Sequence, residues 1–220
     1  MTTAAPQALS GVASDNVPGK DGSYQKKFKY HHGNLRDALI AAAIRILETD
    51  GTEGLSLRAL AKATGVTQAA PYSHFQDKDE LLAAIAEGGF QRLALQMAED
   101  ATGVADVKSR IERLITSYIQ FATDNKALFQ IMFGRELADM KRFPTLAMTA
   151  GKSYSLISTA LAGRGEKGVE TRFLTVSIWS LCHGLTTLIV EGRLDPATFD
   201  TANVAEFVKK TVGLFDNQLV

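Results

Sequence analysis

The chain has 220 residues, of which 45% are hydrophobic and 22% are charged, a composition that is typical of a folded globular protein and excludes a wholly disordered chain. Its 24 basic and 24 acidic residues give a formal net charge of zero, so no field of the whole molecule attracts a polyanion. Cys182 is the one cysteine, which excludes a disulfide within the chain and favours a reducing, cytoplasmic location.

Two segments bear on targeting and on the membrane. Residues 1–23 are small and polar and lack the basic start and apolar block of a secretory signal, so we expect a flexible tail over residues 1–29. The longest uncharged run, residues 173–190, reaches the length of a membrane helix. Because it carries several hydroxyl groups and a histidine, we expect it to lie in a protein core or between subunits, with no membrane involved.

Four short helices are predicted in the first half of the chain. Helical spacing of apolar residues predicts the first over residues 34–50, ended by Gly51. The second starts at Ser56 and stops at Thr64 and Gly65, and a third follows at once, with Thr67 as its cap and Phe75 near its end. A fourth begins near Asp77 or Asp79, with Glu80 placed as a capping-box partner.

After a break around residues 101–105, the helices become longer and more apolar. We expect them over residues 107–123, 126–140, 145–161, 169–191 and 202–216. No alternating apolar run of strand type stands out in the sequence, so the predicted fold class is all-α.

The segment from residue 56 to residue 75 is typical of a helix-turn-helix. Ala61 is small enough for two helices to cross closely, and Gly65 supplies the left-handed residue that a tight turn between helices needs. Such a unit presents the start of its second helix to the major groove of a duplex, although a helical hairpin of another bundle has the same local pattern. Residues 24–75 hold seven basic and four acidic side chains, which favours an anionic partner for this part.

The motifs around this segment resemble those of the TetR family of bacterial transcriptional regulators. The match runs from Gly33 to about Leu93 and includes Thr49-Asp50-Gly51, Glu53-Gly54-Leu55-Ser56-Leu57-Arg58, Leu60-Ala61-x-x-x-Gly65-Val66, Pro71-Tyr72-Ser73-His74-Phe75 and Lys78-Asp79-Glu80-Leu81-Leu82. Further along, Trp179, His183 and Gly184 look like the signature of the WHG type of TetR-like C-terminal domain.

The resemblance implies a domain organisation and a function. A three-helix DNA-binding domain would occupy residues 30–93, with its helix-turn-helix at 56–75, and a helical ligand-binding and dimerisation domain would occupy residues 94–220. The expected protein is a cytoplasmic homodimer that binds a palindromic operator in double-stranded DNA, needs no cofactor, and acts as a repressor released by an unknown small molecule.

The resemblance also implies particular DNA contacts. Gln68 would bond to adenine, the methyl groups of Ala69 and Ala70 would touch thymine, and Arg58 would reach a guanine or a phosphate. Phosphate contacts are expected from other residues of the same surface. The full expected set is Arg58, Thr67, Gln68, Ala69, Ala70, Tyr72, Ser73, His74 and Lys78, with Lys26, Lys27 and Lys29 as a basic arm or, equally, as solvated lysines of the tail.

Pro71 departs from the family pattern, which usually has an aliphatic residue at that position. Because proline has no amide hydrogen, it removes the first regular backbone hydrogen bond of a helix capped by Thr67, so we expect a bend or an altered start there.

In the second half, aromatic and methionine side chains in the middle helices supply candidate pocket walls, although each also fits a plain core. The expected ligand-binding residues are Phe121, Phe129, Met132, Phe133, Trp179 and His183. For His183 itself, a structural role with its hydrogen bond to a neighbouring carbonyl is favoured over a ligand contact, because buried polar groups usually find partners within the protein. Residues 173–190 and the last helix are expected to form a four-helix dimer interface. Gly88 and Gly89 suggest either a hinge or close helix packing.

Two other functions are compatible with an all-α chain of this size. An enzyme is not expected, because Cys182 and His183 are neighbours that point in different directions on a helix, and His31 and His32 lack the spaced partners of a metal site. The alternative kept open is an interaction module that has this fold but has lost operator recognition.

Overall fold

The computed structural model describes residues 35–137, 139–162 and 169–214, and these residues are helical with no strand among them, which confirms the all-α prediction. The α-helices are α1 (Leu35–Gly54), α2 (Leu57–Thr64), α3 (Lys78–Asp100), α4 (Val107–Asp124), α5 (Lys126–Met132), α6 (Pro144–Ala162), α7 (Val169–Val190) and α8 (Val204–Gly213). Short 3-10 turns are η1 (Pro71–Ser73), η2 (Arg135–Leu137), η3 (Met140–Arg142) and η4 (Pro196–Phe199).

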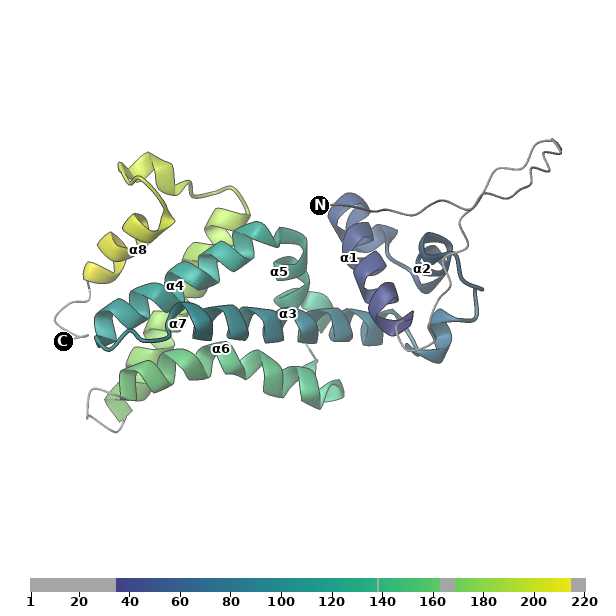
Figure 1. Ribbon diagram of the computed structural model, residues 1–220, viewed down its shortest axis with the longest axis horizontal. Coiled ribbons are helices and arrows are strands. Elements are labelled where there is room, and N and C mark those ends of the chain that lie inside the picture. Colours follow the sequence, from purple (N-terminus) through teal and green to yellow (C-terminus); the bar gives the residue numbers. More distant parts are fainter. Residues whose placement is uncertain (1–34, 138, 163–168, 215–220) are drawn as a thin grey trace, which may run out of the picture. The chain divides into compact units, whose positions relative to one another are not determined.

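Helix α3 connects two groups of helices (Figure 1). At one end it packs against α1, which also contacts α2, and along its length it contacts α4, α5 and α6. We call α1, α2, η1 and the start of α3 the head, and the helices from the rest of α3 to α8 the body. The expected boundary at residues 93 and 94 falls inside the continuous helix α3, so the division into residues 30–93 and 94–220 stays a prediction.

The apolar periodicity of the first helices builds the core of the head. Leu39, Leu60, Phe75 and Leu81 come from four different segments and are each at most 1% exposed. Arg36 lies over the Phe75 ring, with its guanidinium carbon 5.3 Å from the ring centroid. The helical conformation of α1 is interrupted at Gly51, where its end was expected, because φ there is 67°, and a short helical stretch continues to Gly54.

One predicted helix is wrong in its extent. The segment expected as a single helix over residues 126–140 is helical in α5 and then continues as two 3-10 turns. Phe133 leaves the helical conformation with ψ near 10°, and a Cβ atom on the next residue, Gly134, would lie 2.7 Å from the Gln130 carbonyl oxygen. The chain therefore bends sharply here, and α5 stays short.

Helix α7 has two different faces. Thr175, Ile178, Cys182 and Thr186 are buried in the core, and the two threonine hydroxyls donate to carbonyl oxygens one turn earlier. The opposite face is exposed. Among the described residues one segment, Thr171–Val190 of this helix, has the length and the mean hydropathy, 1.6, of a membrane span, and core helices of other proteins share these properties.

Candidate DNA-binding surface and ligand pocket

The first part of the helix-turn-helix forms as its sequence predicts. Ser56 caps α2 by accepting a hydrogen bond from the Ala59 amide, 3.1 Å away. Gly65 ends the helix in the left-handed region with φ of 70°, and its amide bonds back to α2. Val66 follows with a hydrogen bond to the Ala61 carbonyl, and the Thr64 hydroxyl donates to the Leu60 carbonyl, 2.8 Å away.

The second part, expected as a helix from Thr67 to Phe75, has a different hydrogen-bond pattern. The amides of Ala70, Tyr72 and Ser73 each bond to the carbonyl three residues earlier, at 3.0–3.3 Å, and only Phe75 bonds four residues back. Pro71 contributes to this pattern, since it has no amide hydrogen for the Thr67 carbonyl. This segment, which we call the recognition segment, is therefore a series of tight turns with a 3-10 helix at its centre, and the altered start expected from Pro71 is observed.

The residues expected to touch bases lie at the surface. Thr67, Gln68 and Ala69 are exposed, whereas Ala70 is half-buried. Pro71 is buried beneath them. Gln68 and Ala69 are therefore free of the core, Ala70 is only partly so, and Pro71 takes the inward position that an aliphatic residue would fill.

The residues expected to contact phosphates differ in their exposure and in whether they already make a hydrogen bond within the protein. Tyr72 is 52% exposed, and its neighbour Ser73 is exposed but donates its hydroxyl to the Ala70 carbonyl, 2.7 Å away. His74 is half-buried and Arg58 is exposed on α2. Lys78 is half-buried and donates to the Thr52 carbonyl near the end of α1, so it already links the start of α3 to α1. Lys26, Lys27, Lys29, His31 and His32 lie outside the described residues.

The start of α3 is fixed by a reciprocal cap and an ion pair. The Asp77 carboxylate accepts from the Glu80 amide, while the Glu80 carboxylate accepts from the Gln76 amide, which confirms the expected role of Glu80. Arg142 from η3 also bonds to Asp79, at 2.9 Å, and lies 3.5 Å from Asp77. Sequence reasoning missed this contact, because 63 residues separate Arg142 from Asp79 and nothing local pairs them.

The body contains a cluster of aromatic rings around His183. The Tyr118 hydroxyl lies 3.0 Å from Nδ1 of His183, and the Phe133 ring centroid lies 4.5 Å from that of the imidazole. The Trp179 ring stacks on the imidazole of His183, nearly parallel to it, with the two ring centroids 5.5 Å apart. Trp179 and His183 thus lie together on one face of α7, as their spacing predicts, and the partner of Nδ1 is a phenol rather than a backbone carbonyl.

Burial sets the protonation of this cluster. Burial lowers the pKa of His183, so the imidazole is neutral near pH 7, and it raises the pKa of Tyr118 well above its usual range, so the phenol keeps its proton. Burial likewise raises the pKa of the Cys182 thiol, which is fully buried. Cys182 is therefore a core residue and not an activated nucleophile.

A cavity of about 240 Å³ opens beside His183, between α5 and the last half of α7; we call it the aromatic pocket. Of the expected ligand-binding residues, Phe129, Phe133 and His183 line it, whereas Phe121 and Met132 are core residues at most 1% exposed and Trp179 lies behind the imidazole. Sequence reasoning missed the rest of the lining, which is Gln130, Gly134, Thr187, Val190 and Glu191. The helical spacing of His183, Thr187 and Glu191 could have shown that these residues share one face.

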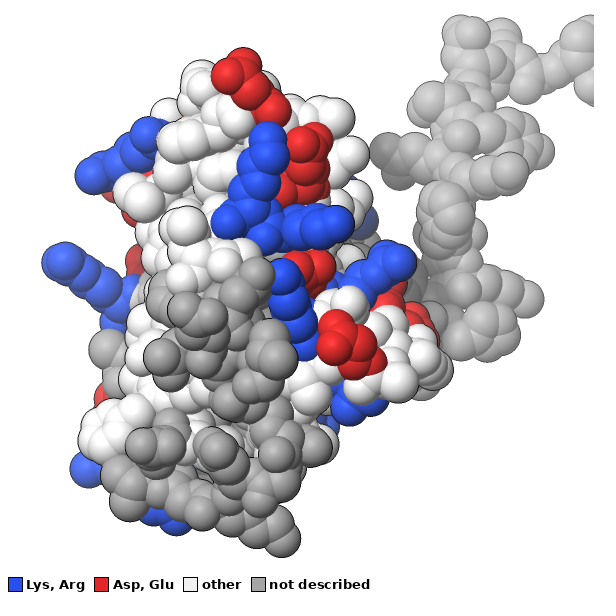
Figure 2. Space-filling view, turned by 90° about the vertical axis from the view of Figure 1, so that its left-hand side faces the viewer, with Lys and Arg blue, Asp and Glu red and all other residues white. Residues whose placement is uncertain are grey.

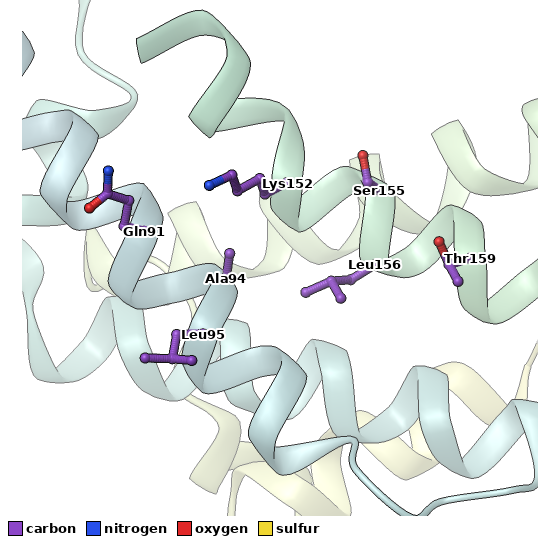
Figure 3. Close-up of a pocket in the computed structure, with 7 residues that line it drawn as sticks. All are labelled: Gln91, Ala94, Leu95, Lys152, Ser155, Leu156 and Thr159. Atoms are coloured by element: carbon purple, nitrogen blue, oxygen red, sulfur yellow. The ribbon is translucent and has the colours of Figure 1, made fainter. Parts of the chain in front are cut away.

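A second, more open cavity of about 510 Å³ lies between α3 and α6; we call it the outer groove. Figure 3 shows Gln91, Ala94 and Leu95 on α3 facing residues of α6. Lys152 is its one charged lining residue, and the other α6 residues are Ser155, Leu156 and Thr159. Sequence reasoning missed this groove because its residues belong to two helices far apart in the chain.

Charge on the end of the body near α8 is mixed. Figure 2 shows basic and acidic side chains next to one another on this face, and within α8 Lys210 pairs with Glu206 at 3.2 Å. The described part of this face therefore presents no patch of one sign for a polyanion. In the described ranges no group of three or more His, Cys, Asp or Glu residues could hold a metal ion.

The head is a helix-turn-helix with exposed candidates for base contacts, and the body that follows it is helical and has a pocket. This combination is typical of DNA-binding regulators with a sensory domain. Residues 39–85 match the family model of the bacterial regulatory proteins of the tetR family, and residues 111–212 match a tetracyclin repressor-like C-terminal domain. The chain belongs to the TetR family of bacterial transcriptional regulators, and the assignment of its body to the WHG type stays a prediction.

Relatives and solved structures agree with this assignment. The chain is 36% identical over 186 residues to the HTH-type nicotine-responsive transcriptional repressor HdnoR of Paenarthrobacter nicotinovorans, covering 81% of this chain and 96% of that protein. It is 48% identical over 52 residues to the class C tetracycline repressor protein of Escherichia coli, covering 24% of each. A solved structure of a protein with unknown function from Rhodococcus sp. RHA1 superposes with a TM-score of 0.74 at 32% identity, covering 88% of this chain and 99% of that one.

Proposed function

We propose that this protein is a cytoplasmic, homodimeric transcriptional repressor that binds a palindromic operator and is released from it by a small molecule in the body. The observation that carries the proposal is that both halves of the chain match TetR-type domains, one of them the DNA-binding domain. The HTH-type nicotine-responsive repressor, 96% of which the alignment covers, is by its name a transcriptional repressor that responds to a small molecule. Catalysis has no support from the described residues, and we propose no enzymatic activity.

For the head, we propose that the recognition segment enters the major groove. Gln68 and Ala69 are exposed where base edges would lie, and Tyr72 and Arg58 flank them at the surface. A glutamine side chain can bond bidentately to adenine, while the flanking groups bond to phosphates and set the register. The half-buried, hydrogen-bonded Lys78 would contribute mainly through its charge near the start of α3.

For the dimer, we propose that the exposed face of α7 packs against its copy. Phe173 (69% exposed) and Leu188 (40%) lie at its two ends, and Ser177, Ser180 and Gly184 lie between them at helical spacing. Small residues let two helices approach closely, and the stripe carries no charge. From the last helix, Phe207, Val208 and Val212 are already buried within the chain, so the exposed Leu214 is its described contribution; Phe215 lies outside the described residues.

For release, we propose that α5 couples the pocket to the head. Phe129 on α5 and Phe133 directly after it line the aromatic pocket, while α5 also contacts α1 and α3. A Cβ atom on Gly89 of α3 would lie 2.6 Å from Sδ of Met132 on α5, so Gly89 supports close packing rather than the hinge. A ligand that displaces α5 would shift the population towards a dimer whose two recognition segments no longer fit successive grooves.

The first experiment is selection of bound duplexes from a random DNA pool with the full chain. We expect an inverted repeat with half-sites about one helical turn, or a multiple of it, apart. Affinity should fall steeply between about 50 and 200 mM salt, because phosphate contacts release counterions. If no motif emerges, the chain is an interaction module without operator recognition, and the recognition segment shaped by Pro71 is the cause to test.

Two pairs of variants then test the details on the selected operator. Gln68→Ala should weaken binding and relax preference at one base pair by about 1–3 kcal/mol, whereas Gln120→Ala, on an exposed part of α4, should leave it unchanged. Gly89→Ala should weaken ligand-driven release, because its methyl group displaces Met132, whereas Gly88→Ala meets no atom within 4 Å and should keep it. Equal release by both glycine variants would contradict coupling through α5.

A further inference from the structure

The aromatic pocket has a chemistry that narrows the ligand it accepts, and this inference rests on the proposed function of that pocket. Its walls are the rings of Phe129 and Phe133, whose centroids lie 4.8 Å apart, together with the imidazole of His183. Ring faces of this kind accept flat apolar groups and cations. At about 240 Å³ the pocket lies just below the usual range of ligand sites, about 300–1,000 Å³, so it suits a small molecule.

The hydrogen-bonding role of His183 follows from its partner. The Tyr118 side chain is 1% exposed, and Nδ1 of His183 is the one acceptor that the described residues offer to its hydroxyl. Because a buried phenol keeps its proton and donates it, Nδ1 is the acceptor, and the neutral imidazole carries its own proton on Nε2. No partner of Nε2 occurs among the described residues, and His183 lines the pocket. The pocket thus has a fixed N–H donor, which selects an acceptor.

The charge of the pocket indicates a second group that the ligand should carry besides a hydrogen-bond acceptor. Glu191 is the one lining residue that is charged, and it follows the last residue of α7 directly, with its amide bonded to the carbonyl of Thr187, which also lines the pocket. Its carboxylate pairs with Arg193 at 2.9 Å, but the Arg193 side chain is 72% exposed. An exposed pair of this kind is weak, so a bound ammonium group can compete for the carboxylate. The carboxylate of Glu191 therefore favours a cation over an anion at this end of the pocket.

We propose that the aromatic pocket binds a small heteroaromatic amine, whose ring nitrogen accepts the proton of His183 Nε2 and whose protonated aliphatic amine lies near Glu191. The outer groove differs in this respect, because its one charged lining residue, Lys152, is basic and would repel such a ligand. Tyr118 is a positioning residue, since it holds the imidazole in the tautomer that donates into the pocket.

The test uses the full chain without DNA and three probes of matched shape. Nicotine has the ring nitrogen and the amine, N-methyl-phenylpyrrolidine lacks the ring nitrogen, and cyclopentylpyridine lacks the amine. Calorimetry measures their affinities, and quenching of Trp179, the one tryptophan of the chain, reports occupancy beside His183. We expect nicotine to bind about tenfold more tightly than N-methyl-phenylpyrrolidine, the phenyl compound. We expect it to bind about twofold to fivefold more tightly than cyclopentylpyridine, which carries no positive charge on an amine.

Variants assign these differences to residues. His183→Phe keeps a ring but removes the donor, so it should weaken nicotine about tenfold and leave the phenyl compound unchanged. Glu191→Gln should weaken nicotine about twofold to fivefold, less at high salt, and leave cyclopentylpyridine unchanged. Lys152→Met is the matched control in the outer groove and should change none of the three affinities. Thermal unfolding checks that each variant folds, and the probe series on the unmodified chain needs no variant.

Several results would overturn the proposal. These are no binding of nicotine, equal affinity for nicotine and the phenyl compound, or a loss of nicotine binding in Lys152→Met, which would move the site to the outer groove. Binding is measured without an operator, so its outcome is separate from that of the DNA selection. If the probes are discriminated but no DNA motif is selected, this inference stands and the proposed repressor function is refuted. If a DNA motif is selected but no probe binds, the repressor function stands and this inference is refuted.

Discussion

Tyr72 and Tyr118 show how differently the head and the body use the same side chain. Tyr72 is 52% exposed on the recognition segment, in a stretch whose conformation comes from residues within four positions. Tyr118 is 1% exposed, and its hydroxyl reaches His183, 65 residues away in the chain. The head therefore presents its functional groups on a locally determined surface. In the body, by contrast, candidate groups such as Tyr118 and Phe129 are also part of the core, so the proposed function and the stability depend on the same residues.

The largest expected effect tests this contrast directly. Tyr118→Ala removes a buried ring and should lower the free energy of unfolding by about 3–5 kcal/mol, as other buried aromatic truncations do. Tyr72→Ala removes an exposed ring and should change it by at most about 0.5 kcal/mol, while weakening operator binding. Urea unfolding of both variants measures the difference. Similar losses of stability in the two variants would contradict the division between head and body.

A medium effect is expected at the turn of the helix-turn-helix. Gly65 has φ of 70°, and a Cβ atom there would meet nothing within 4 Å, so the cost of a side chain comes from the backbone alone. Gly65→Ala should therefore lower the free energy of unfolding by about 1–2 kcal/mol. Thermal or urea unfolding measures this loss, and Gly65→Asn, which tolerates the left-handed region better, should lose less.

A smaller effect of opposite sign is expected in α3. Gly88 lies inside a regular helix, and a Cβ atom there would also meet nothing within 4 Å. Gly88→Ala should raise the free energy of unfolding by about 0.5–1 kcal/mol, because alanine loses less conformational freedom on folding. A destabilised Gly88→Ala in the same unfolding assay would show that the chain bends at this position and would revive the hinge.

The smallest expected effect is a pH dependence that belongs to the body. Because burial lowers the pKa of His183 below its usual value of 6.5, the unfolded chain takes up this proton first as the pH falls. Stability should not depend on His183 above about pH 6.5 and should decline as the pH drops below that value. Unfolding at a series of pH values from 7.5 to about 5 measures the slope, which should be shallower in His183→Phe; an unchanged slope would contradict a neutral, buried imidazole.

Local sequence predicted most of the head. Ser56, Gly65, Asp77 and Glu80 take the capping and turn positions that their types and spacing indicate, because caps depend on backbone groups within a few residues. Pro71 is equally local: the missing amide hydrogen predicted an altered start, and the recognition segment has one. The exposed positions of Gln68 and Ala69 follow from the same local geometry, whereas their DNA contacts remain predictions.

The body was predictable as a set of helices but not as a site. Apolar spacing located α4, α6 and α7 to within a few residues, yet it could not separate core residues from pocket residues, since both are apolar and periodic. Phe121 and Phe133 illustrate this limit: the first is core and the second lines the aromatic pocket. Glu191 was missed because it lies at the end of α7, where a charged residue usually faces only solvent.

The sequence by itself determined the helices, their caps and the helix-turn-helix, since these depend on hydrogen bonds and side-chain periods within a few residues. Only the tertiary structure decided which residues from distant segments meet: Tyr118 with His183, Arg142 with Asp79, and Gly89 with Met132. It also decided which face of α7 the chain covers and which it leaves exposed. These outcomes depend on packing between helices, which brings together residues that are far apart in the chain and that no local pattern pairs.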